Sequence, residues 1–289
     1  MPIEIFRMHK IIDGKALAEE LLFQLAERIS SFCPECCKPR LHAIIVGDNP
    51  ASQVYVNNKI RACKKVGIKS EVHHLPQSTS TLELQEIINN LNHTADVHGI
   101  LVQLPLPDHI NPTDIIEVID PKKDVDGFHP YNIGRLAARN PTLRPCTPAG
   151  VMHILNSLDV PIKGKHAVVV GASNIVGRPL VLELLLAGAT VTCCHRFTEN
   201  LSNITQKGDI LISAVGKPKF INSHAVKPQS IVIDVGITRT ENGLVGDVDF
   251  EEVKSKVSYI TPVPGGVGPL TVAMLLLNTI HAYNLQRHK

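Results

Sequence analysis

The chain has 289 residues, enough for one large or two ordinary domains, and 44% of them are hydrophobic, which provides for a sizeable core. The formal net charge is only +2 and no Trp is present, so the composition indicates neither a basic nucleic-acid surface nor an aromatic platform for stacking bases. We therefore expect no nucleic-acid partner.

Neither end of the sequence predicts a membrane or export segment. The uncharged run 268–286 includes Pro269 and Asn278, which is typical of a buried helix and not of a membrane span, so we expect no membrane partner. The first ten residues carry charged side chains and lack a long apolar core, so no secretory signal is expected, and Met8 is an alternative start.

The cysteines include one close cluster. There are seven of them, an odd number, and Cys33, Cys36 and Cys37 form a C-x-x-C-C pattern. A zinc site would need a second pair of ligands at suitable spacing, and a thioredoxin-like site would need the pair to open a helix after a strand. Here the cluster follows a predicted helix and precedes a predicted strand. We therefore expect reduced thiols in a surface loop, a cytoplasmic location and no metal site.

The first half of the chain alternates between helical and strand patterns. Residues 13–31 have apolar side chains at a helical period, and residues 41–46 form an apolar strand closed by Gly-Asp-Asn-Pro. Ser52 is positioned to cap the next helix. The elements predicted after this strand are a helix at 52–66, a strand at 71–75, a helix at 82–91, a strand at 100–104 and a short helix at 115–119.

Residues 165–180, KHAVVVGASNIVGRPL, predict a strand, a glycine turn and a helix. The strand is apolar and β-branched, as in strands buried on both faces, and Gly171 ends it. Ser173 or Asn174 can cap the helix, and Gly177 leaves room where the helix crosses the strand. Backbone N–H groups at such a turn bind phosphate. The usual G-x-G-x-x-G lacks its middle glycine here, so an ordinary strand-turn-helix is the alternative.

Three further short apolar strands follow, at 190–194, 209–215 and 231–235, and this alternation implies a parallel sheet with right-handed crossovers. In an NAD site, a carboxylate after the second strand accepts hydrogen bonds from the ribose hydroxyls. This sequence has His195 and Arg196 there instead. A cation suits a 2′-phosphate, so we favour NADP as the cofactor, and the alternative is that Arg196 is a solvated loop charge.

These patterns predict an α/β fold with two domains around a cleft, the second a Rossmann-like doubly wound parallel sheet. We place the first, substrate-binding domain at 1–148 and expect the C-terminal helix, at about 270–289, to complete it. The nucleotide-binding domain takes 149–269. Residues 121–150, rich in Pro, Gly and Asn, are predicted to form the cleft and linker, followed by a linking helix at 151–158.

Two stretches of the first domain place polar side chains where a substrate could bind. Tyr55 and Lys59 lie one helical turn apart, and a Lys beside a phenol can move protons. Short-chain dehydrogenases also use Y-x-x-x-K, but downstream of the glycine-rich loop, so the order here argues against that class. Gln103 ends a strand, at the sheet edge where α/β proteins bind ligands. The alternatives are a surface pair and a buried Gln satisfied by the backbone.

Two loops add to these stretches. The loop KDVDGFH carries Asp124 and Asp126, and a carboxylate can accept two parallel hydrogen bonds from an amidine-like edge such as that of a pterin. Metal ligation and plain turn chemistry are the alternatives. The loop 261–271, TPVPGGVGPLT, is rigid and glycine-rich, which lets the backbone approach a flat ligand closely.

Taken together and in this order, the YVNNK, VQLPLP, KDVDGFH, GASNIVG and PVPGGVGP stretches resemble the bifunctional methylenetetrahydrofolate dehydrogenase/methenyltetrahydrofolate cyclohydrolase family, in its bacterial monodomain type. The resemblance covers nearly the whole chain, from HKIIDGKAL to the last helix. It implies NADP-dependent oxidation of 5,10-methylenetetrahydrofolate to the 5,10-methenyl form and hydrolysis of that product to 10-formyltetrahydrofolate in one shared active site. It also implies a place in one-carbon metabolism and purine biosynthesis, and a homodimer formed through the nucleotide domains.

The resemblance gives individual residues their expected roles. Lys59 transfers protons, Tyr55 stacks on the folate, Gln103 tunes Lys59, and Asp126 holds the pterin. Many relatives carry Arg where this chain has Ala172, so binding of the 2′-phosphate rests more on the arginine after the second strand. Further substrate contacts are expected from Leu104, Pro264, Gly265 and Gly266, and cofactor contacts from Gly171, Ala172, Ser173, Arg196 and Ile237.

The chemistry is consistent with a single site for both steps. Both pass through a planar cationic centre, which a charged Lys would oppose, whereas a neutral Lys59 could also activate water. Two rivals remain. Another two-domain NADP dehydrogenase, of a shikimate or amino-acid type, would not explain the three motifs Y-x-x-x-K, DVDG and PVPGGVG together. A non-catalytic folate- or nucleotide-binding module would not need the Lys.

Overall fold

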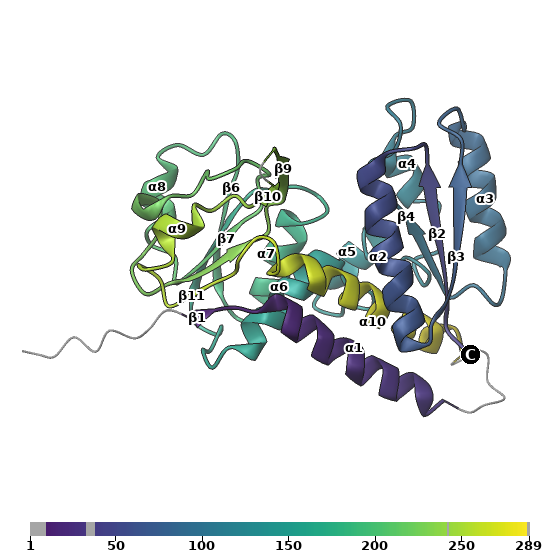
Figure 1. The fold of residues 1–289 in the computed structure, drawn as a ribbon, viewed down its shortest axis with the longest axis horizontal. Coiled ribbons are helices and arrows are strands. Elements are labelled where there is room, and N and C mark those ends of the chain that lie inside the picture. Colours follow the sequence, from purple (N-terminus) through teal and green to yellow (C-terminus); the bar gives the residue numbers. More distant parts are fainter. Residues whose placement is uncertain (1–9, 33–37, 242, 288–289) are drawn as a thin grey trace, which may run out of the picture. The chain divides into compact units, whose positions relative to one another are not determined.

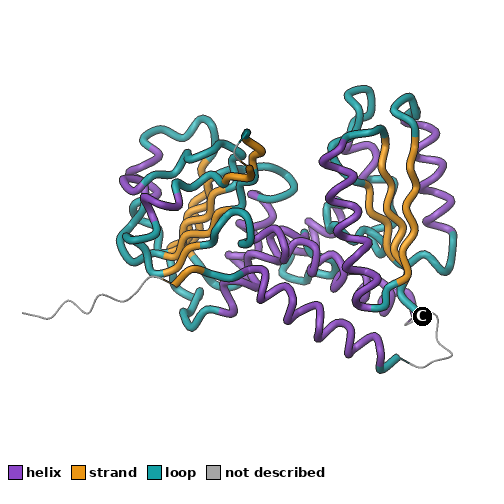
Figure 2. The backbone as a smooth tube through the Cα atoms, viewed as in Figure 1, coloured by secondary structure: helices purple, strands orange, loops and turns teal. Residues whose placement is uncertain are grey.

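The computed structural model describes residues 10–32, 38–241 and 243–287, which divide into two compact units (Figure 1, Figure 2). The six-strand unit comprises the chain before Ala18 together with Thr147–Thr271, and the three-strand unit comprises Ala18–Cys146 and the chain from Val272 onward. Met8 and the cysteine cluster at 33–37 lie outside the described residues. The chain passes from one unit to the other within α1 (Gly14–Ser30), α6 (Cys146–Ser157) and α10 (Val267–Arg287).

The three-strand unit is built on a parallel sheet. Its elements in chain order are β2 (Arg40–Val46), α2 (Pro50–Val66), β3 (Lys69–Leu75), α3 (Thr81–His93), β4 (Gly99–Val102), α4 (Pro112–Ile116) and α5 (Pro130–Ala137). The strand order is β3-β2-β4, so the chain moves from β2 to one side and then to the other. One face of β2 and β4 packs on α3 through the buried side chains Ile44, Val46, Leu84, Ile88, Leu91, Ile100 and Val102.

Local sequence signals fix where two helices of this unit begin. At α3, the Glu83 N–H donates to Ser80 Oγ at 3.2 Å and the Ser80 N–H donates to Glu83 Oε2 at 2.7 Å, which is a capping box. At α2, the prediction that Ser52 is the cap is wrong. The helix begins at Pro50, and Asn49 Oδ1 accepts the Ser52 N–H at 3.2 Å. The Asn-Pro pair that closes the preceding turn thus also starts the helix.

The six-strand unit holds a longer parallel sheet. Its elements are β1 (Lys10–Ile11), β5 (His166–Val170), α7 (Gly177–Leu186), β6 (Thr190–Cys194), α8 (Leu201–Thr205), β7 (Ile210–Ser213), the 3-10 turn η1 (Ser223–Ala225), β8 (Ile231–Asp234), β9 (Thr238–Thr240), β10 (Gly243–Val245), α9 (Phe250–Val253) and β11 (Tyr259–Ile260). The order is β1-β11-β8-β7-β5-β6 with every pairing parallel, and β9 and β10 form a separate antiparallel pair (Figure 1). The predicted α/β fold with a parallel sheet is confirmed.

The strand order of this sheet marks one of its edges. From β5 the chain moves to β6 on one side and then to β7 on the other, so the order reverses between β5 and β7. In open α/β sheets, ligands bind outside the carboxyl ends of the strands at such a reversal. The two strands end at Val170 and Ser213, directly before Gly171 and Ala214.

The division into units differs from the expected domains at the N-terminal side. The expected first domain began at residue 1, but β1 pairs with β11, and the Ile12 N–H donates to the Ile260 carbonyl at 2.8 Å. A strand of two residues has no period that a sequence pattern could show. The strands β9 and β10, of three residues each, were not predicted either, and α5 lies in the stretch 121–150 that was predicted to form the cleft and linker. No described helix combines the length and apolar character needed to cross a membrane.

Candidate active site

Lys59 lies buried on α2, against a glutamine that follows β4. Its Nζ donates to Gln103 Oε1 at 3.1 Å, and 9% of the residue is exposed. Gln103 Nε2 donates to the Leu104 carbonyl at 2.6 Å, which turns the amide oxygen toward the ammonium. Tyr55, one turn before Lys59 on the helix, is 43% exposed. Lys59 is therefore no surface residue, and the sheet brings it to Gln103 across 44 positions of sequence.

Asp124 organises the loop that carries the second predicted carboxylate. Its two oxygens accept the N–H groups of Gly127 at 3.1 Å, Phe128 at 3.3 Å and His129 at 2.8 Å, and Asn132 Nδ2 at 2.9 Å. Burial raises the pKa of Asp124, and these hydrogen bonds oppose the rise. Asp124 thus stabilises the turn, which is the plain turn chemistry named above as an alternative.

Asp126 lies two residues further on in a different environment. Burial raises its pKa to about 6, the ammonium of Lys59 opposes that rise, and the charge of Asp124 adds to it. No hydrogen bond to the Asp126 carboxylate occurs within the described part of the chain, so both oxygens can accept from a ligand. Gly127 next to it has φ 75°, and a Cβ there would lie 2.4 Å from the Arg144 carbonyl carbon, so the loop requires glycine.

Asn278 of α10 fixes the backbone beside Asp126, and no sequence pattern predicted this role. Its Nδ2 donates to the Val125 carbonyl at 2.8 Å and to the Arg144 carbonyl at 2.7 Å. The first of these contacts spans 153 positions, so no local pattern could have predicted it. Cys146 Sγ also donates to the Val125 carbonyl, at 3.2 Å, and burial raises its pKa well above the usual value, which keeps it a thiol.

The glycine turn after β5 is tightly packed. Gly171 has φ 116°, and a Cβ there would lie 2.3 Å from the Ala214 carbonyl oxygen at the end of β7. A Cβ on Gly177 would lie 1.9 Å from the Gly171 oxygen. Only glycine therefore fits at either end of the turn, and the helix crosses the strand as closely as predicted.

The predicted cap of α7 needs correction. The N-cap position is Val176, not Ser173 or Asn174, and its side chain makes no cap bond. Ser173 Oγ instead accepts the N–H groups of Val176 at 3.2 Å and Gly177 at 3.3 Å. The serine hydroxyl thereby shapes the turn in front of the helix.

Two arginines flank this turn. Arg196, after β6, is exposed and stacks over the Phe197 ring at 4.6 Å. Arg178, at the start of α7, donates Nε to the Ala172 carbonyl at 3.1 Å. Burial raises the pKa of Cys193 in β6, and the charge of Arg178 opposes that rise. Arg178 was not singled out from the sequence, where it reads as an ordinary helix residue.

The loop between β11 and α10 packs against the start of α1. The Gly265 carbonyl accepts the Lys15 N–H at 3.1 Å, and a Cβ on Gly14 would lie 1.9 Å from the Gly266 oxygen. Ile237, 42% exposed, places its Cδ1 3.7 Å from where a Cβ of Gly268 would be. The loop with Pro264 thus lies near Ile237 in the six-strand unit, whereas Tyr55, Lys59, Gln103, Leu104 and Asp126 belong to the three-strand unit.

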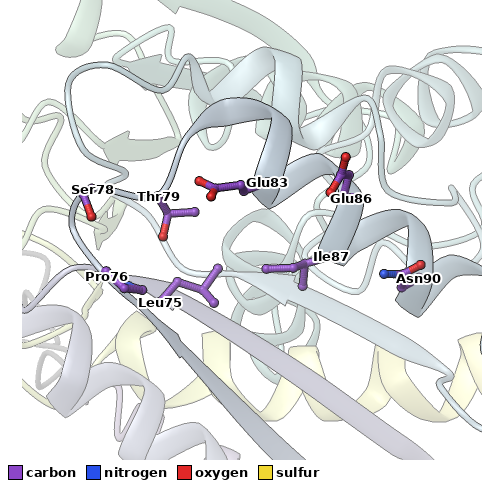
Figure 3. Close-up of a pocket in the computed structure, with 8 residues that line it drawn as sticks. All are labelled: Leu75, Pro76, Ser78, Thr79, Glu83, Glu86, Ile87 and Asn90. Carbon is purple, nitrogen blue, oxygen red and sulfur yellow. The ribbon is translucent and has the colours of Figure 1, made fainter.

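A shallow hollow of about 410 Å³ lies elsewhere, between the end of β3 and α3 (Figure 3). Its lining contains none of the predicted site residues, and Glu83 within it is engaged in the capping box. The residues around it are Leu75, Pro76, Ser78, Thr79, Glu83, Glu86, Ile87 and Asn90. We assign it no role in the site.

Comparison with known proteins agrees with this geometry. The catalytic domain of the tetrahydrofolate dehydrogenase/cyclohydrolase family matches residues 12–126, and the NAD(P)-binding domain of the same family matches residues 145–287. The chain belongs to this family. The family expected from the sequence motifs is therefore confirmed, and the rival dehydrogenase types are set aside.

Solved structures of family members match over nearly the whole chain. The bifunctional enzyme FolD of Campylobacter jejuni, a methylenetetrahydrofolate dehydrogenase/cyclohydrolase, is 52% identical with a TM-score of 0.94, covering 96% of this chain and 99% of that one. A silkworm (Bombyx mori) 5,10-methylenetetrahydrofolate dehydrogenase is 45% identical with a TM-score of 0.92 over 98% and 100%. The Trypanosoma brucei dehydrogenase-cyclohydrolase, solved with NADP and an inhibitor, is 37% identical with a TM-score of 0.92 over 97% and 99%.

The raised pKa of Asp126 predicts a pH-dependent stability. Its pKa is about 6 in the folded chain and 3.8 ordinarily, so the folded state holds the proton to higher pH than the unfolded state. Stability therefore falls as pH rises from about 4 to about 6 and stays reduced above. Asp126→Asn removes this loss. Urea unfolding should show the variant gaining roughly 1–3 kcal/mol over wild type between pH 4 and pH 7.

The exposed Asp108→Asn is the matched control and should follow wild type at both pH values. A difference between Asp126→Asn and wild type that is the same at pH 4 and pH 7 would contradict the assignment of the raised pKa to Asp126.

Proposed function

We propose that this chain oxidises 5,10-methylenetetrahydrofolate to 5,10-methenyltetrahydrofolate with NADP and hydrolyses the product to 10-formyltetrahydrofolate. The observation that carries the proposal is the buried Lys59, held by Gln103 and close enough to Asp126 to shift its pKa. The Campylobacter jejuni relative, 52% identical, is named for both activities, and the Trypanosoma brucei relative was solved with NADP, which supports the proposal.

The three-strand unit offers the groups that a pterin needs. The pterin edge presents an amino group and a ring N–H side by side, and the Asp126 carboxylate can accept a hydrogen bond from each. With a pKa of about 6, that carboxylate is mostly ionised at neutral pH. The partly exposed Tyr55 ring provides a flat surface on which the folate can stack.

Lys59 is the proposed base of the second step. In the first, the methylene carbon gives up a hydride and becomes part of a planar cation. In the second, water adds to the methenyl carbon, and Lys59 takes the proton that the water loses. The bond from that carbon to N5 then breaks, the proton passes from Lys59 to N5, and the hydroxyl of the adduct loses its own proton to solvent as the formyl C=O forms on N10. Gln103 Oε1, 3.1 Å from Nζ, holds the amine in place.

The six-strand unit fits NADP, which supplies the hydride acceptor when bound. The reversal of strand order lies at Gly171, where the absence of a Cβ lets the turn close against Ala214. Backbone N–H groups of this turn can then bind the pyrophosphate. Ala172 carries no charge, and we assign the 2′-phosphate to Arg196, which follows β6, and to Arg178, whose Nε donates to the Ala172 carbonyl. Ile237 provides a further contact.

Lys59→Met should abolish the hydrolysis and spare the fold. Met keeps the length and the apolar stem and has a similar helix propensity, but it cannot accept a proton. Loss of a general base costs about 10²–10⁴-fold, so the decay of methenyl absorbance should slow by that factor, whereas folate binding should change little. The dehydrogenase should fall less, because hydride transfer depends mainly on how the reactants are held.

Lys64→Met is the matched control, because Lys64 lies exposed one turn further along the same helix. It should retain both activities, and circular dichroism should show both variants folded. Hydrolysis within a few-fold of wild type in folded Lys59→Met would remove Lys59 from the mechanism.

Removing either arginine should weaken the preference for NADP over NAD. A charge-assisted hydrogen bond contributes about 1.5–3 kcal/mol, so the ratio of the two kcat/KM values should fall roughly tenfold or more in Arg196→Ala and in Arg178→Ala. The double variant should lose the preference. Lys207→Ala, at an exposed position before β7, should leave the ratio unchanged. An unchanged ratio in the double variant would show that neither arginine contacts the 2′-phosphate.

We further propose a homodimer formed through the six-strand units, in the cytoplasm, supplying one-carbon units for purine biosynthesis. The outer strand β6 presents a sheet edge that a second copy can cover, and the four described cysteines are free thiols, as in reducing compartments. Sedimentation equilibrium should give twice the chain mass of 31.5 kDa. A monomer at assay concentrations would contradict this.

A further inference from the structure

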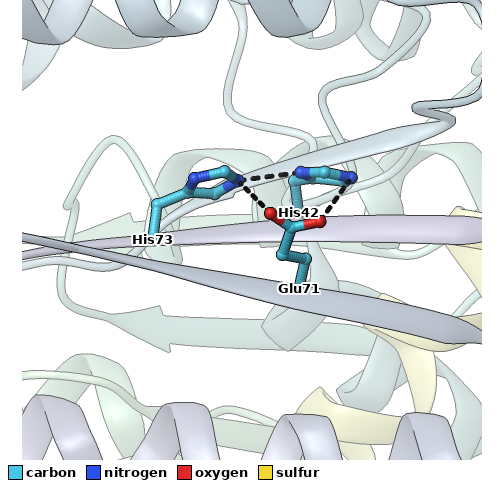
Figure 4. Close-up of side chains that lie close together, drawn as sticks. All are labelled: His42, Glu71 and His73. Atoms are coloured by element: carbon cyan, nitrogen blue, oxygen red, sulfur yellow. Dashed lines mark hydrogen bonds and ion pairs between the residues drawn. The ribbon is translucent and has the colours of Figure 1, made fainter.

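Three side chains that could ligate a metal ion lie close together on one face of the three-strand sheet, and none of them belongs to the proposed folate or NADP site. His42 lies on β2 beside Glu71 of β3, and His73 lies two residues further along β3, opposite Ile44. Because side chains alternate along strands and the pairing is parallel, all three point to the same face (Figure 4). One potential ligand atom from each lies within 4.8 Å of the other two.

The buried imidazole of His42 lacks a hydrogen-bond partner at one of its two ring nitrogens among the described residues. Its Nδ1 lies 2.8 Å from His73 Nε2, which is a hydrogen bond. Its Nε2 has no hydrogen-bond partner among the described residues, although only 5% of His42 is exposed. Glu71 Oε2 is 3.9 Å away, too far for a hydrogen bond. A buried ring nitrogen without a partner is costly, so this cluster is incomplete as it stands.

We infer that His42, Glu71 and His73 form a binding site for a divalent transition-metal ion such as Zn²⁺. Two imidazole nitrogens and one carboxylate oxygen are a ligand set that zinc accepts, with water in the remaining position. Hard ions such as Mg²⁺ prefer oxygen ligands and do not suit two imidazoles. Tetrahedral ligands on one zinc ion lie about 3.3 Å apart, so ligand atoms within 4.8 Å of one another need to close by up to about 1.5 Å.

The surroundings allow this closure. The Glu71 side chain is 61% exposed and can swing, while His42 and His73 are held on adjacent strands. Two cations, Arg40 and Lys123, lie within electrostatic range of His42. The two cations are themselves engaged: Arg40 pairs with Asp96 at 3.4 Å, and Lys123 Nζ donates to three backbone carbonyls.

A bound ion would cross-link β2 to the outer strand β3. It binds the folded chain and not the unfolded one, because residues 42 and 73 come together only in the sheet, and so it raises the unfolding temperature. The expectation of no metal site rested on the cysteine spacing and did not consider these residues, since 31 positions separate the two histidines. This inference is independent of the proposed reaction.

The test uses the full chain, freed of metal by a chelator and then exposed to Zn²⁺, Co²⁺ or Mg²⁺ alone. The variants are His73→Ala and Glu71→Gln, both at partly exposed positions that should fold. His74→Ala is the matched control: it removes the neighbouring histidine of β3, which is exposed and pairs with Ile45, so its side chain points to the opposite face. The readouts are zinc per chain after dialysis, and the unfolding temperature.

We expect wild type and His74→Ala to retain one more zinc per chain than His73→Ala. Zn²⁺ should raise their unfolding temperature by several degrees, and Mg²⁺ should not. Glu71→Gln should bind at least tenfold more weakly. Co²⁺ bound here should lack the thiolate charge-transfer band that the cysteine cluster would give. Equal zinc content in His73→Ala and wild type, a zinc effect lost equally in His74→Ala, or cobalt spectra of thiolate type alone would overturn the inference.

Discussion

Buried carboxylates hold the loops that follow the parallel strands in both units, and the proposed site depends on those loops. A loop packed at the end of a sheet buries N–H groups that have no strand partner, and each must be satisfied. In the three-strand unit, Asp124 meets this need. In the six-strand unit, Asp234 accepts the N–H groups of Gly236, Asp247 and Val248, and Asp247 accepts those of Val215 and Lys217 and the Ser213 hydroxyl. Burial raises the pKa of Asp234 to about 6, and the hydrogen bonds from these N–H groups oppose that rise by favouring the charged carboxylate.

The two carboxylates of the DVDG loop show how such support divides roles between similar groups. Asp124 has its oxygens filled by the loop backbone, so it cannot serve a ligand without releasing the turn. The Asp126 carboxylate, two residues later, accepts no hydrogen bond within the described chain, and the charge of Lys59 lowers its pKa. A sequence pattern cannot separate them, because both are Asp in a glycine loop. The two differ because the buried N–H groups of residues 127–129 donate to the Asp124 carboxylate and not to that of Asp126. The path of the chain around Gly127 decides which carboxylate these groups reach.

The sequence predicted most elements that carry a clear period, including β2, β5, β6 and the long helices, and it drew attention to Lys59, Gln103 and the glycine turn. It failed where the deciding contact was distant. β1 is two residues long and exists because β11 lies beside it. Asn278 donates to the Val125 carbonyl, which is far away in sequence. Arg178 donates to the Ala172 carbonyl, in the turn that precedes its own helix. The cap of α2 was misjudged for a local reason, since Asn49 had been read as part of the turn alone.

Each sheet reverses its strand order beside one strand, β2 in the three-strand unit and β5 in the six-strand unit, and open α/β sheets bind ligands at such a reversal. In the three-strand unit the reversal lies between β2 and β4, and Gln103 follows β4 there, bonded through its N–H to Ile44. In the six-strand unit it lies at Gly171. The carboxyl ends of the strands supply a side chain that holds the proposed base in the three-strand unit, and backbone N–H groups for a phosphate in the six-strand unit. His42 lies near the opposite, amino end of β2, away from both reversals. A metal ion held there acts on the pairing of β2 with β3, and therefore on stability, without taking part in the folate chemistry.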